Sequence, residues 1–134
     1  MNVLSPPLKL ILETEKRAQA IDITSMVESR LSELEIDSGV NIWVPHTTAG
    51  VTVNESADPA VMSDLIEQFE ELIPRDNNYQ HMEGNSAAHV KSILLDCHQW
   101  LPVENGSLAL GRWQGLFFME WDGPRSRKFY IYPH

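Results

Sequence analysis

The sequence predicts one α+β domain, residues 1–134, in which mostly antiparallel β-sheets form a sandwich-like arrangement with about three helices. Segments typical of strands lie toward both ends of the chain, and segments with helical spacing lie between them. A chain of 134 residues is also long enough for a single hydrophobic core. Apolar residues make up 43% and charged residues 22% of the chain, which is typical of a globular protein.

The N-terminal part predicts two strands and a helix. Residues 8–12 form a compact apolar run, and residues 18–23 alternate between apolar and polar side chains. Because a short polar segment separates them, we expect these strands to pair as a hairpin around residues 15–16. Ser25 and Glu28 have the spacing of a capping box, which predicts that the first helix begins there.

The middle of the chain predicts two strands followed by a long helix. Residues 40–44 alternate and lead into His46, and residues 51–53 continue as a second strand. Asp58 followed by Pro59 predicts a helix start, since Asp caps helices and Pro suits the first helical position. The apolar side of this helix is expected to consist of Val61, Met62, Leu65, Ile66, Phe69, Leu72 and Ile73.

The C-terminal half predicts a short helix and several strands. Asn85 can cap a helix over residues 86–95. Residues 116–119 are apolar on both faces, so we expect a strand buried on both sides, to which another subunit contributes one cover. The apolar contacts of the helix are expected to be Val90, Ile93 and Leu94, and the strands are expected at residues 100–103, 108–110, 116–121 and 125–132.

The last two strands are expected to form a hairpin. Residues 122–123 are a strong signal for a two-residue turn, which places Glu120 opposite Arg125. A three-residue turn places Glu120 opposite Ser126 instead. In either register Arg125 and Arg127 share a face and can clamp a phosphate. Because Glu120 follows an apolar run, we expect it to be partly buried, and a buried carboxylate must be either paired or protonated.

Charge and cysteine content limit the classes of function. The chain has 19 acidic and 10 basic residues, a net charge of −9, which argues against nucleic-acid binding. The single cysteine, Cys97, cannot form an internal disulfide, so we expect a cytoplasmic location. Residues 1–7 do not have the pattern of an export signal, and no segment has the roughly 20 apolar residues of a membrane span.

Three histidines in the middle of the chain are candidates for chemistry. His46 follows a predicted strand, His81 lies in a predicted loop, and His89 shares a helix face with Asn85. Imidazoles titrate near neutral pH, so this cluster can carry positive charge or transfer a proton. It can also bind a divalent metal, Zn²⁺ or Mg²⁺, and the sequence leaves these alternatives open.

Four motifs in order along the chain resemble those of the YjbQ family of secondary thiamine-phosphate synthases. They are HTTAG at residues 46–50, NExxDP at 54–59, GxWQG at 111–115 and EWDGPRxR at 120–127. The chain departs from the family pattern at Arg112, where the family commonly has Thr, and at residues 96–97, where it commonly has a glycine-containing turn. The resemblance implies a homotrimer.

The resemblance also implies an enzyme that acts on a small phosphorylated molecule. Its reaction would join a pyrimidine methyl diphosphate to a thiazole phosphate and release diphosphate. The catalytic residues would be His46, His81, His89 and Glu120, and the substrate-binding residues Thr47, Asn54, Asn85, Gln114, Arg125 and Arg127.

Other functions fit the same residues. A histidine- or metal-assisted hydrolase of a small phosphate ester would use the same histidine cluster. A non-catalytic oligomer that binds a small anion is a second alternative. In a third, the polar cluster only stabilises contacts between subunits.

Overall fold

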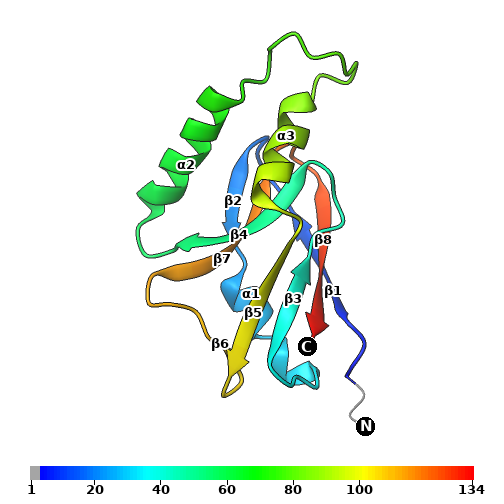
Figure 1. Ribbon diagram of the computed structural model, residues 1–134, viewed down its shortest axis with the longest axis vertical. Helices are drawn as coiled ribbons and strands as arrows, with labels where there is room; N and C mark the ends of the chain where they lie inside the picture. The colour runs from blue at the N-terminus through cyan, green and yellow to red at the C-terminus, as the bar shows by residue number, and fades with distance from the viewer. Residues whose placement is uncertain (1–3) are drawn as a thin grey trace.

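The computed structural model describes residues 4–134, which form two antiparallel β-sheets packed face to face (Figure 1). Residues 1–3 lie outside the described residues. They are part of residues 1–7, the segment for which no export signal is expected. The elements in chain order are β1 (Leu8–Glu13), β2 (Gln19–Asp22), α1 (Thr24–Glu28), η1, a 3₁₀ turn (Leu31–Glu33), β3 (Gly39–Trp43), β4 (Ala49–Glu55), α2 (Pro59–Leu72), α3 (Ser86–Leu95), β5 (His98–Glu104), β6 (Ser107–Leu108), β7 (Gln114–Glu120) and β8 (Ser126–Pro133). The expected α+β architecture of antiparallel sheets with three helices is confirmed.

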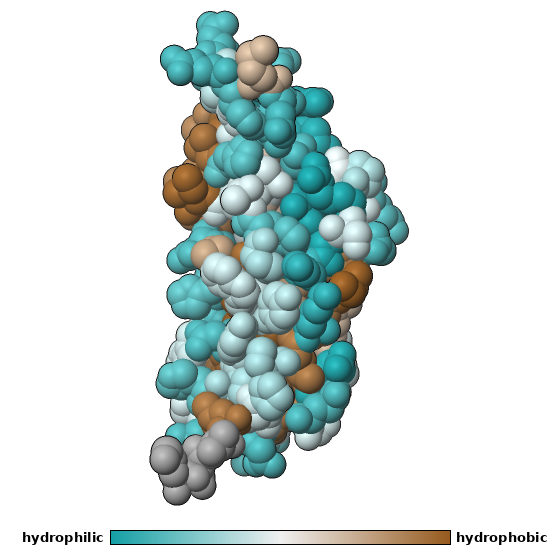
Figure 2. Space-filling model, turned by 90° about the vertical axis from the view of Figure 1, so that its right-hand side faces the viewer, coloured by the Kyte–Doolittle hydropathy of each residue, from teal (hydrophilic) through white to brown (hydrophobic). Residues whose placement is uncertain are grey.

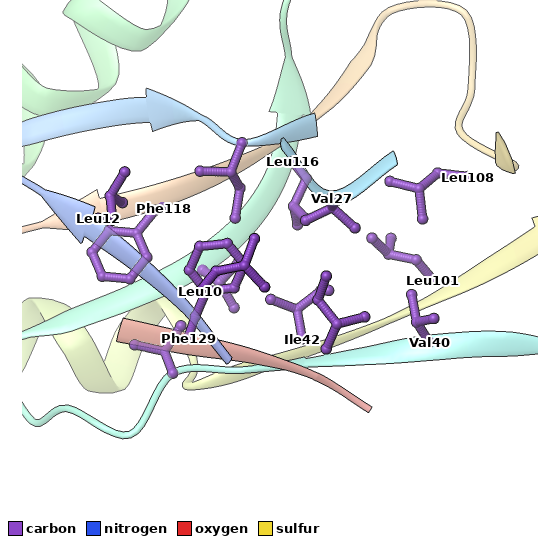
Figure 3. Close-up of a cluster of buried hydrophobic side chains, with 14 of the residues drawn as sticks. Leu10, Leu12, Val27, Val40, Ile42, Leu101, Leu108, Leu116, Phe118 and Phe129 are labelled. Atoms are coloured by element: carbon purple, nitrogen blue, oxygen red, sulfur yellow. The ribbon is translucent and has the colours of Figure 1, made fainter. Parts of the chain in front are cut away.

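The larger sheet has the strand order β1-β8-β3-β5-β6, and the smaller sheet has the order β2-β7-β4. All of the pairs are antiparallel, from β1 with β8 to β4 with β7. The main core lies between the sheets (Figure 3). It contains alternate residues of the facing strands, such as Leu10, Ile42, Phe118 and Phe129, as the period of two in a strand requires.

Strand β7 is buried on both faces, as its unbroken apolar run predicts. Leu116 and Phe118 point into the core between the sheets. Phe117 and Met119 point to the other side, where they pack against Met62 of α2 and other residues of the two long helices. The second cover therefore comes from the same chain, and β7 gives no reason to invoke another subunit.

Both expected hairpins are wrong. Strand β1 pairs with β8 and β2 pairs with β7, so the first two strands lie in different sheets. Likewise β7 belongs to the smaller sheet and β8 to the larger one, and residues 121–125 cross from one sheet to the other. Neither register proposed for Glu120 therefore exists, because β7 and β8 do not pair.

The first helix is shorter than its sequence pattern suggests. Helix α1 covers only five residues and has no side-chain cap, so the capping box of Ser25 and Glu28 is wrong. The side chain of Asp22 instead accepts hydrogen bonds from the backbone nitrogen of Thr24 at 2.9 Å and its hydroxyl at 2.6 Å. The start of α2 is as predicted, since Asp58 Oδ1 accepts a hydrogen bond from the Ala60 nitrogen at 2.9 Å.

Helix α3 has the predicted bounds but packs through a different face. Its buried residues are Ala87, Ala88, Lys91 and Ser92. The residues expected to make its apolar contacts are exposed: Val90 by 40%, Ile93 by 81% and Leu94 by 60%. In Figure 2 hydrophobic atoms gather at the left-hand edge of the upper half of the molecule, at the height that α3 has in Figure 1. Within residues 4–134, no helix is both long enough and apolar enough to cross a bilayer.

Candidate functional site

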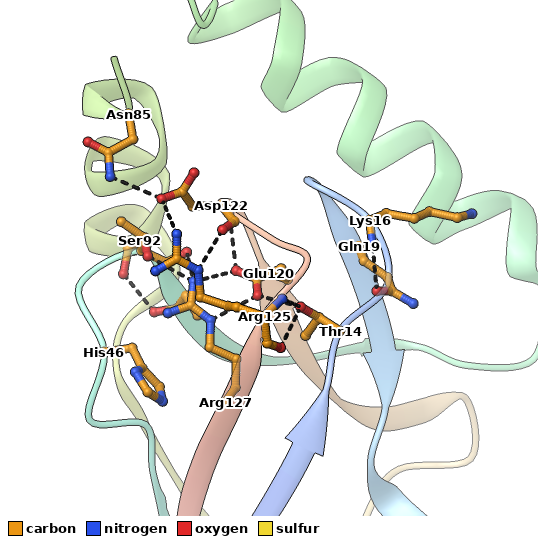
Figure 4. A network of polar contacts seen from close by, with 12 residues as sticks. Thr14, Lys16, Gln19, His46, Asn85, Ser92, Glu120, Asp122, Arg125 and Arg127 are labelled. Atoms are coloured by element: carbon orange, nitrogen blue, oxygen red, sulfur yellow. Dashed lines mark hydrogen bonds and ion pairs between the residues drawn. The ribbon is translucent and has the colours of Figure 1, made fainter. Parts of the chain in front are cut away.

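The candidate site lies at one end of the sandwich, where the segment between β3 and β4, the start of β8, the end of β7 and helix α3 meet (Figure 4). The register places Ala49, the first residue of β4, opposite Glu120, the last residue of β7. The polar segment before β4 therefore lies beside the crossing from β7 to β8. Ser92 of α3 donates a hydrogen bond to the Ala49 carbonyl oxygen at 2.7 Å, which holds the helix against this end of the sheet.

The centre of the site is a buried ion pair between Glu120 and Arg127. Glu120 is 0% exposed and Arg127 is 4% exposed. Arg127 donates from Nε to Glu120 Oε1 at 2.8 Å and from Nη2 to Oε2. Its Nη2 also donates to the Thr48 hydroxyl at 2.8 Å. The expected burial of Glu120 is confirmed, and of the two alternatives for its carboxylate the structure shows the paired one.

The carboxylate of Glu120 has a full set of donors. Besides the two bonds from Arg127, the Thr14 hydroxyl donates to Oε1 at 2.8 Å and the Asp122 backbone nitrogen donates to Oε2 at 3.1 Å. Burial by itself raises the pKa of Glu120, but Arg127, Asp122 and Thr14 outweigh it, so the pKa is lowered and the carboxylate is charged. Because a carboxylate has about four acceptor positions, this geometry suits Glu120 for positioning Arg127 rather than for binding a ligand.

His46 is held by the backbone of β8. Strand β3 ends at Trp43, which lies opposite Tyr130, so Lys128 has no strand partner on that side. The imidazole of His46 occupies the position of the missing strand partner. Its Nε2 lies 3.0 Å from the Lys128 backbone nitrogen and 3.1 Å from the Lys128 carbonyl oxygen. Lys128 can therefore donate to one neutral tautomer of His46 or accept from the other.

The position of His46 favours a neutral imidazole. Burial lowers the pKa of His46 and the nearby Arg127 guanidinium lowers it further, although the Lys128 backbone and Glu120 act in the opposite direction. The hydrogen bonds of this ring within residues 4–134 are made through Nε2, which leaves Nδ1 for a ligand. A neutral imidazole with one unengaged nitrogen can accept a proton or bind a metal.

A pocket of about 420 Å³ lies beside His46. Its volume falls in the usual range for small-molecule sites, roughly 300–1,000 Å³. Burial, with Asp96 adding to it, raises the pKa of the Cys97 thiol in its wall, so this cysteine is a poor candidate for a nucleophile. The lining residues come from the segment before β4, from α3 and from the turn before β5: His46, Thr47, His89, Ser92, Ile93, Asp96 and Cys97.

The three candidate histidines form a chain rather than a cluster. The rings of His81 and His89 meet edge to face with centroids 5.5 Å apart, and His89 shares the pocket with His46. Among residues 4–134, however, no three His, Cys, Asp or Glu side chains are grouped so that they could hold a metal ion. The residues of one chain in this arrangement therefore do not fit the three-histidine metal site.

Asn85 and Arg125 meet at Asp122. Asn85 does not cap α3 with its side chain; its Nδ2 donates to Asp122 Oδ2 at 3.0 Å. Arg125 donates to the same oxygen at 2.9 Å and to the Asp122 carbonyl oxygen at 2.8 Å. Each arginine thus pairs with a carboxylate of its own, Arg125 with Asp122 and Arg127 with Glu120. The expected clamp of two free guanidiniums is wrong, although the Arg125 side chain remains 49% exposed.

Asn54 and Gln114 lie at the opposite end of the smaller sheet. Gln114 is the first residue of β7, and Glu120 lies six positions further along the strand at its other end, roughly 20 Å away. Both side chains bind nearby backbone: Asn54 accepts from the Glu55 nitrogen at 2.7 Å, and Gln114 accepts from the Gly111 nitrogen at 2.8 Å. Within one chain these two predicted substrate-binding residues therefore do not meet the histidines.

The sequence analysis assigned no role to Thr14, Thr48 or Lys91, although Thr48 lies within the HTTAG motif. Thr14 and Thr48 complete the hydrogen bonds of the buried pair, yet Thr14 is 106 residues from Glu120 in the sequence. Lys91 is 1% exposed, with its Nζ 3.1 Å from Glu70 Oε1 and 5.3 Å from the centre of the Trp121 ring. A signal for Lys91 was present, because it lies one turn from Ala87 and Ala88, whose small side chains predict a closely packed helix face.

Comparison with known proteins identifies the family. The family described as "UPF0047 protein YjbQ-like" matches residues 8–133. The UPF0047 protein YugU of Bacillus subtilis is 51% identical over 124 residues, which cover 91% of this chain and 94% of that protein. A UPF0047 protein of Methanocaldococcus jannaschii is 47% identical over 132 residues, covering 98% of this chain and 96% of that one. The chain belongs to the YjbQ-like UPF0047 family.

Solved structures of YjbQ-like proteins share the fold. A YjbQ/UPF0047 family protein from Clostridium acetobutylicum is 42% identical, with a TM-score of 0.88 over 92% of this chain and 97% of that one. A conserved hypothetical protein from Thermus thermophilus is 43% identical, with a TM-score of 0.88 over 95% of this chain and 99% of that one. The family suggested by the four sequence motifs is therefore confirmed.

Proposed function

We propose that this YjbQ-like protein is an enzyme that acts on a phosphorylated small molecule in the pocket beside His46. The observation that carries the proposal is the state of His46, which is held by the Lys128 backbone, has a lowered pKa and keeps Nδ1 unengaged. A neutral imidazole beside a pocket of this size is suited to proton transfer. Arg125 lies at the same end of the sandwich with its side chain 49% exposed, and although it pairs with Asp122 it can also contact an anion.

The first candidate reaction is thiamine-phosphate synthesis. In it a thiazole phosphate displaces diphosphate from a pyrimidine methyl diphosphate. The resemblance of the four motifs supports this reaction. The second candidate is hydrolysis of a small phosphate ester, and the lowered pKa of His46 favours it, because a neutral imidazole can accept a proton from the attacking water.

Two assays separate these reactions. The purified protein is incubated with the pyrimidine and thiazole phosphates and the formation of thiamine phosphate is followed, and it is tested separately for phosphate release from simple phosphate esters. In whichever assay shows turnover, His46→Gln should lower kcat by about 100-fold or more if His46 transfers a proton. His134→Gln changes an exposed histidine at the C-terminus and should leave kcat unchanged. A variant His46→Gln with full turnover would refute the proposed role.

We also propose that the protein works as a homotrimer in which the site lies between subunits. The resemblance supports the trimer, and the positions of Asn54 and Gln114 support a shared site, since these side chains lie roughly 20 Å from Glu120 in their own chain. A repeated contact between unlike ends of the molecule closes into a ring of three when neighbours are related by a third of a turn, and in such a ring Gln114 of one subunit would meet the pocket of the next.

Mixing inactive subunits tests the shared site. His46→Gln and Gln114→Ala subunits are unfolded together, refolded together and assayed. In a shared site some pockets then combine an intact His46 with an intact Gln114, so part of the activity should return. Co-refolded subunits without activity, together with a monomeric mass in sedimentation equilibrium, would refute both the trimer and the shared site.

It stays a prediction that the protein binds a divalent metal, Zn²⁺ or Mg²⁺. It also stays a prediction that the protein is located in the cytoplasm. The residues of one chain do not provide a three-ligand site within residues 4–134, so no step of the proposed reaction is assigned to a metal. Elemental analysis of protein purified without chelators tests the metal. The single cysteine supports the cytoplasm, and fractionation of the source cells tests that location.

A further inference from the structure

The outward face of the larger sheet carries an unusual set of exposed aromatic side chains. Trp43 is 39% exposed, Trp100 is 45% exposed and Tyr132 is 42% exposed. They come from three neighbouring strands, β3, β5 and β8, and alternate with core residues such as Ile42, Leu101 and Ile131. Large aromatic residues are usually kept on a surface because they contact a partner or ligand.

The strand registers show how these side chains lie side by side. Lys9 is opposite Tyr130, Tyr130 is opposite Trp43, and Trp43 is opposite His98, which makes one row across four strands. Directly opposed residues in antiparallel strands have Cβ atoms about 4.5–5.5 Å apart on the same face. The row therefore forms a continuous aromatic surface with a cationic lysine at one end.

Neighbouring rows extend this surface. Tyr132 and Trp100 flank Asn41 in the row on one side, and the rings of Tyr130 and Tyr132 have centroids 6.2 Å apart. In the row on the other side, Lys128 lies opposite Ile11. We call the side chains of these three rows the aromatic face: Lys9, Ile11, Asn41, Trp43, His98, Trp100, Lys128, Tyr130 and Tyr132.

The charge of the aromatic face is opposite to that of the molecule. The whole chain carries a net charge of −9, yet the three rows contain Lys9 and Lys128 and no Asp or Glu. Flat aromatic rings stack on heterocycles, and lysines pair with phosphate. Two lysines are too few for a nucleic-acid strand, whose binding requires neutralisation of many phosphates. The chemistry therefore fits a single heterocycle that carries one phosphate group.

We propose that the aromatic face binds a nucleotide-like ligand, an aromatic heterocycle bearing a phosphate, with Trp43 and Tyr130 stacking on the ring and Lys9 and Lys128 pairing with the phosphate. None of these four residues lines the pocket beside His46. The inference therefore concerns a second surface and does not depend on the proposed reaction.

Equilibrium binding of adenosine 5′-monophosphate to the intact protein tests this inference. Isothermal titration calorimetry should give saturable binding of this probe. Adenosine, which lacks the phosphate, and ribose 5-phosphate, which lacks the ring, should each bind at least about tenfold more weakly, since stacking or charge pairing is then lost. The proposal would be overturned if the nucleotide, adenosine and ribose 5-phosphate bind with similar affinities. It would also be overturned if the nucleotide does not bind at millimolar concentration.

Substitutions locate the binding surface. Trp43→Ala should weaken binding of the nucleotide at least about fivefold because one stacking surface is removed. Trp113→Ala is the matched control, since Trp113 is also exposed, by 55%, but precedes β7 at the far end of the smaller sheet. Lys128→Gln should weaken binding of the nucleotide and leave binding of adenosine unchanged. Equal effects of the two tryptophan substitutions would place the ligand elsewhere.

Two other occupants give different results. If a second copy of the chain covers the aromatic face, Trp43→Ala should reduce the mass measured by sedimentation equilibrium, and the nucleotide should not bind. If the occupant is a single-stranded polymer, an oligouridylate should bind at least about tenfold more tightly than the mononucleotide. Either result overturns the proposal. Turnover is not measured in any of these experiments, so the proposed function can fail or stand independently.

Discussion

Replacing Glu120 by Gln tests whether the buried ion pair stabilises the fold. Glutamine keeps the shape of the side chain and one oxygen that can accept a hydrogen bond from Thr14. Its amide nitrogen is a donor, however, and it faces Arg127 and the Asp122 nitrogen, which are donors too. Arg127 then keeps its charge at 4% exposure without a counter-ion. Removing one partner of a buried pair costs about 3–5 kcal/mol, so we expect Glu120→Gln to lower the free energy of unfolding by about 3 kcal/mol.

Urea denaturation measures this loss. With a typical slope of about 1–3 kcal/mol per molar urea, the midpoint should fall by about 1–3 M. The control is Glu33→Gln, which breaks the exposed pair of Glu33 with Arg30 and should leave the midpoint unchanged. The double variant Glu120→Leu/Arg127→Met removes both charges and should recover most of the loss. Equal midpoints for the variants at positions 120 and 33 would refute the reasoning.

The same pair predicts how stability depends on pH. The pKa of Glu120 is lowered in the folded protein, so the unfolded chain binds this proton at a higher pH than the folded chain does. The stabilisation is therefore fully present above the unfolded pKa of about 4.3 and is lost as the pH falls through the lower folded pKa. The difference in unfolding free energy between the wild type and Glu120→Gln should narrow over that range.

Three further predictions concern other parts of the fold, each measured by urea denaturation. Because the pKa of His46 is lowered, the unfolded chain takes up its proton first, so stability should fall below about pH 6.5, and His46→Gln should remove part of that fall. Glu70→Ala leaves Lys91 buried without its partner and should cost about 2 kcal/mol, more than Lys91→Met. Gly39→Ala places a Cβ atom 2.8 Å from the Trp100 ring and 2.4 Å from a backbone oxygen, which should cost about 1–3 kcal/mol.

Local signals in the sequence predicted most of the elements. The compact apolar run of β1 and the alternation in β2 and β3 identified these strands, and the pair Asp58 and Pro59 placed the start of α2. These signals work because the period of a strand and the cap of a helix depend on residues that are close in the chain. Strand pairing depends on distant residues and was predicted wrongly for both expected hairpins.

Helix α3 shows why hydrophobicity alone misplaced a packing face. Its large apolar residues are exposed, and its small ones face the sheet. Space at that contact is limited: a Cβ atom added to Gly50 of β4 would lie 2.7 Å from the Asp96 oxygen and 3.4 Å from the Cβ of Leu95. Where two elements approach this closely, the size of the side chains decides which face is buried, and the apolar pattern does not report size.

The sequence predicted only part of the candidate site, because some of its contacts join residues that are far apart in the chain. His46, Glu120 and Arg127 belong to recognisable motifs, and the structure brings them together. Thr14 lies in none of these motifs, and the HTTAG motif that contains Thr48 does not indicate its role, because hydroxyl groups become partners only after the fold has placed them beside the buried charges. The sequence thus indicates which residue types are unusual, and the fold decides which of them meet.

The crossing from β7 to β8 explains why those residues meet at this end of the sandwich. Glu120 ends a strand of the smaller sheet and Arg127 lies near the start of a strand of the larger one, so their ion pair joins the two sheets. Lys128, the next residue, holds His46 through its backbone, and burial, followed by the Arg127 charge, lowers the pKa of that imidazole. The change of sheet therefore lets the buried ion pair join the two sheets and places the Lys128 backbone and the Arg127 charge beside His46.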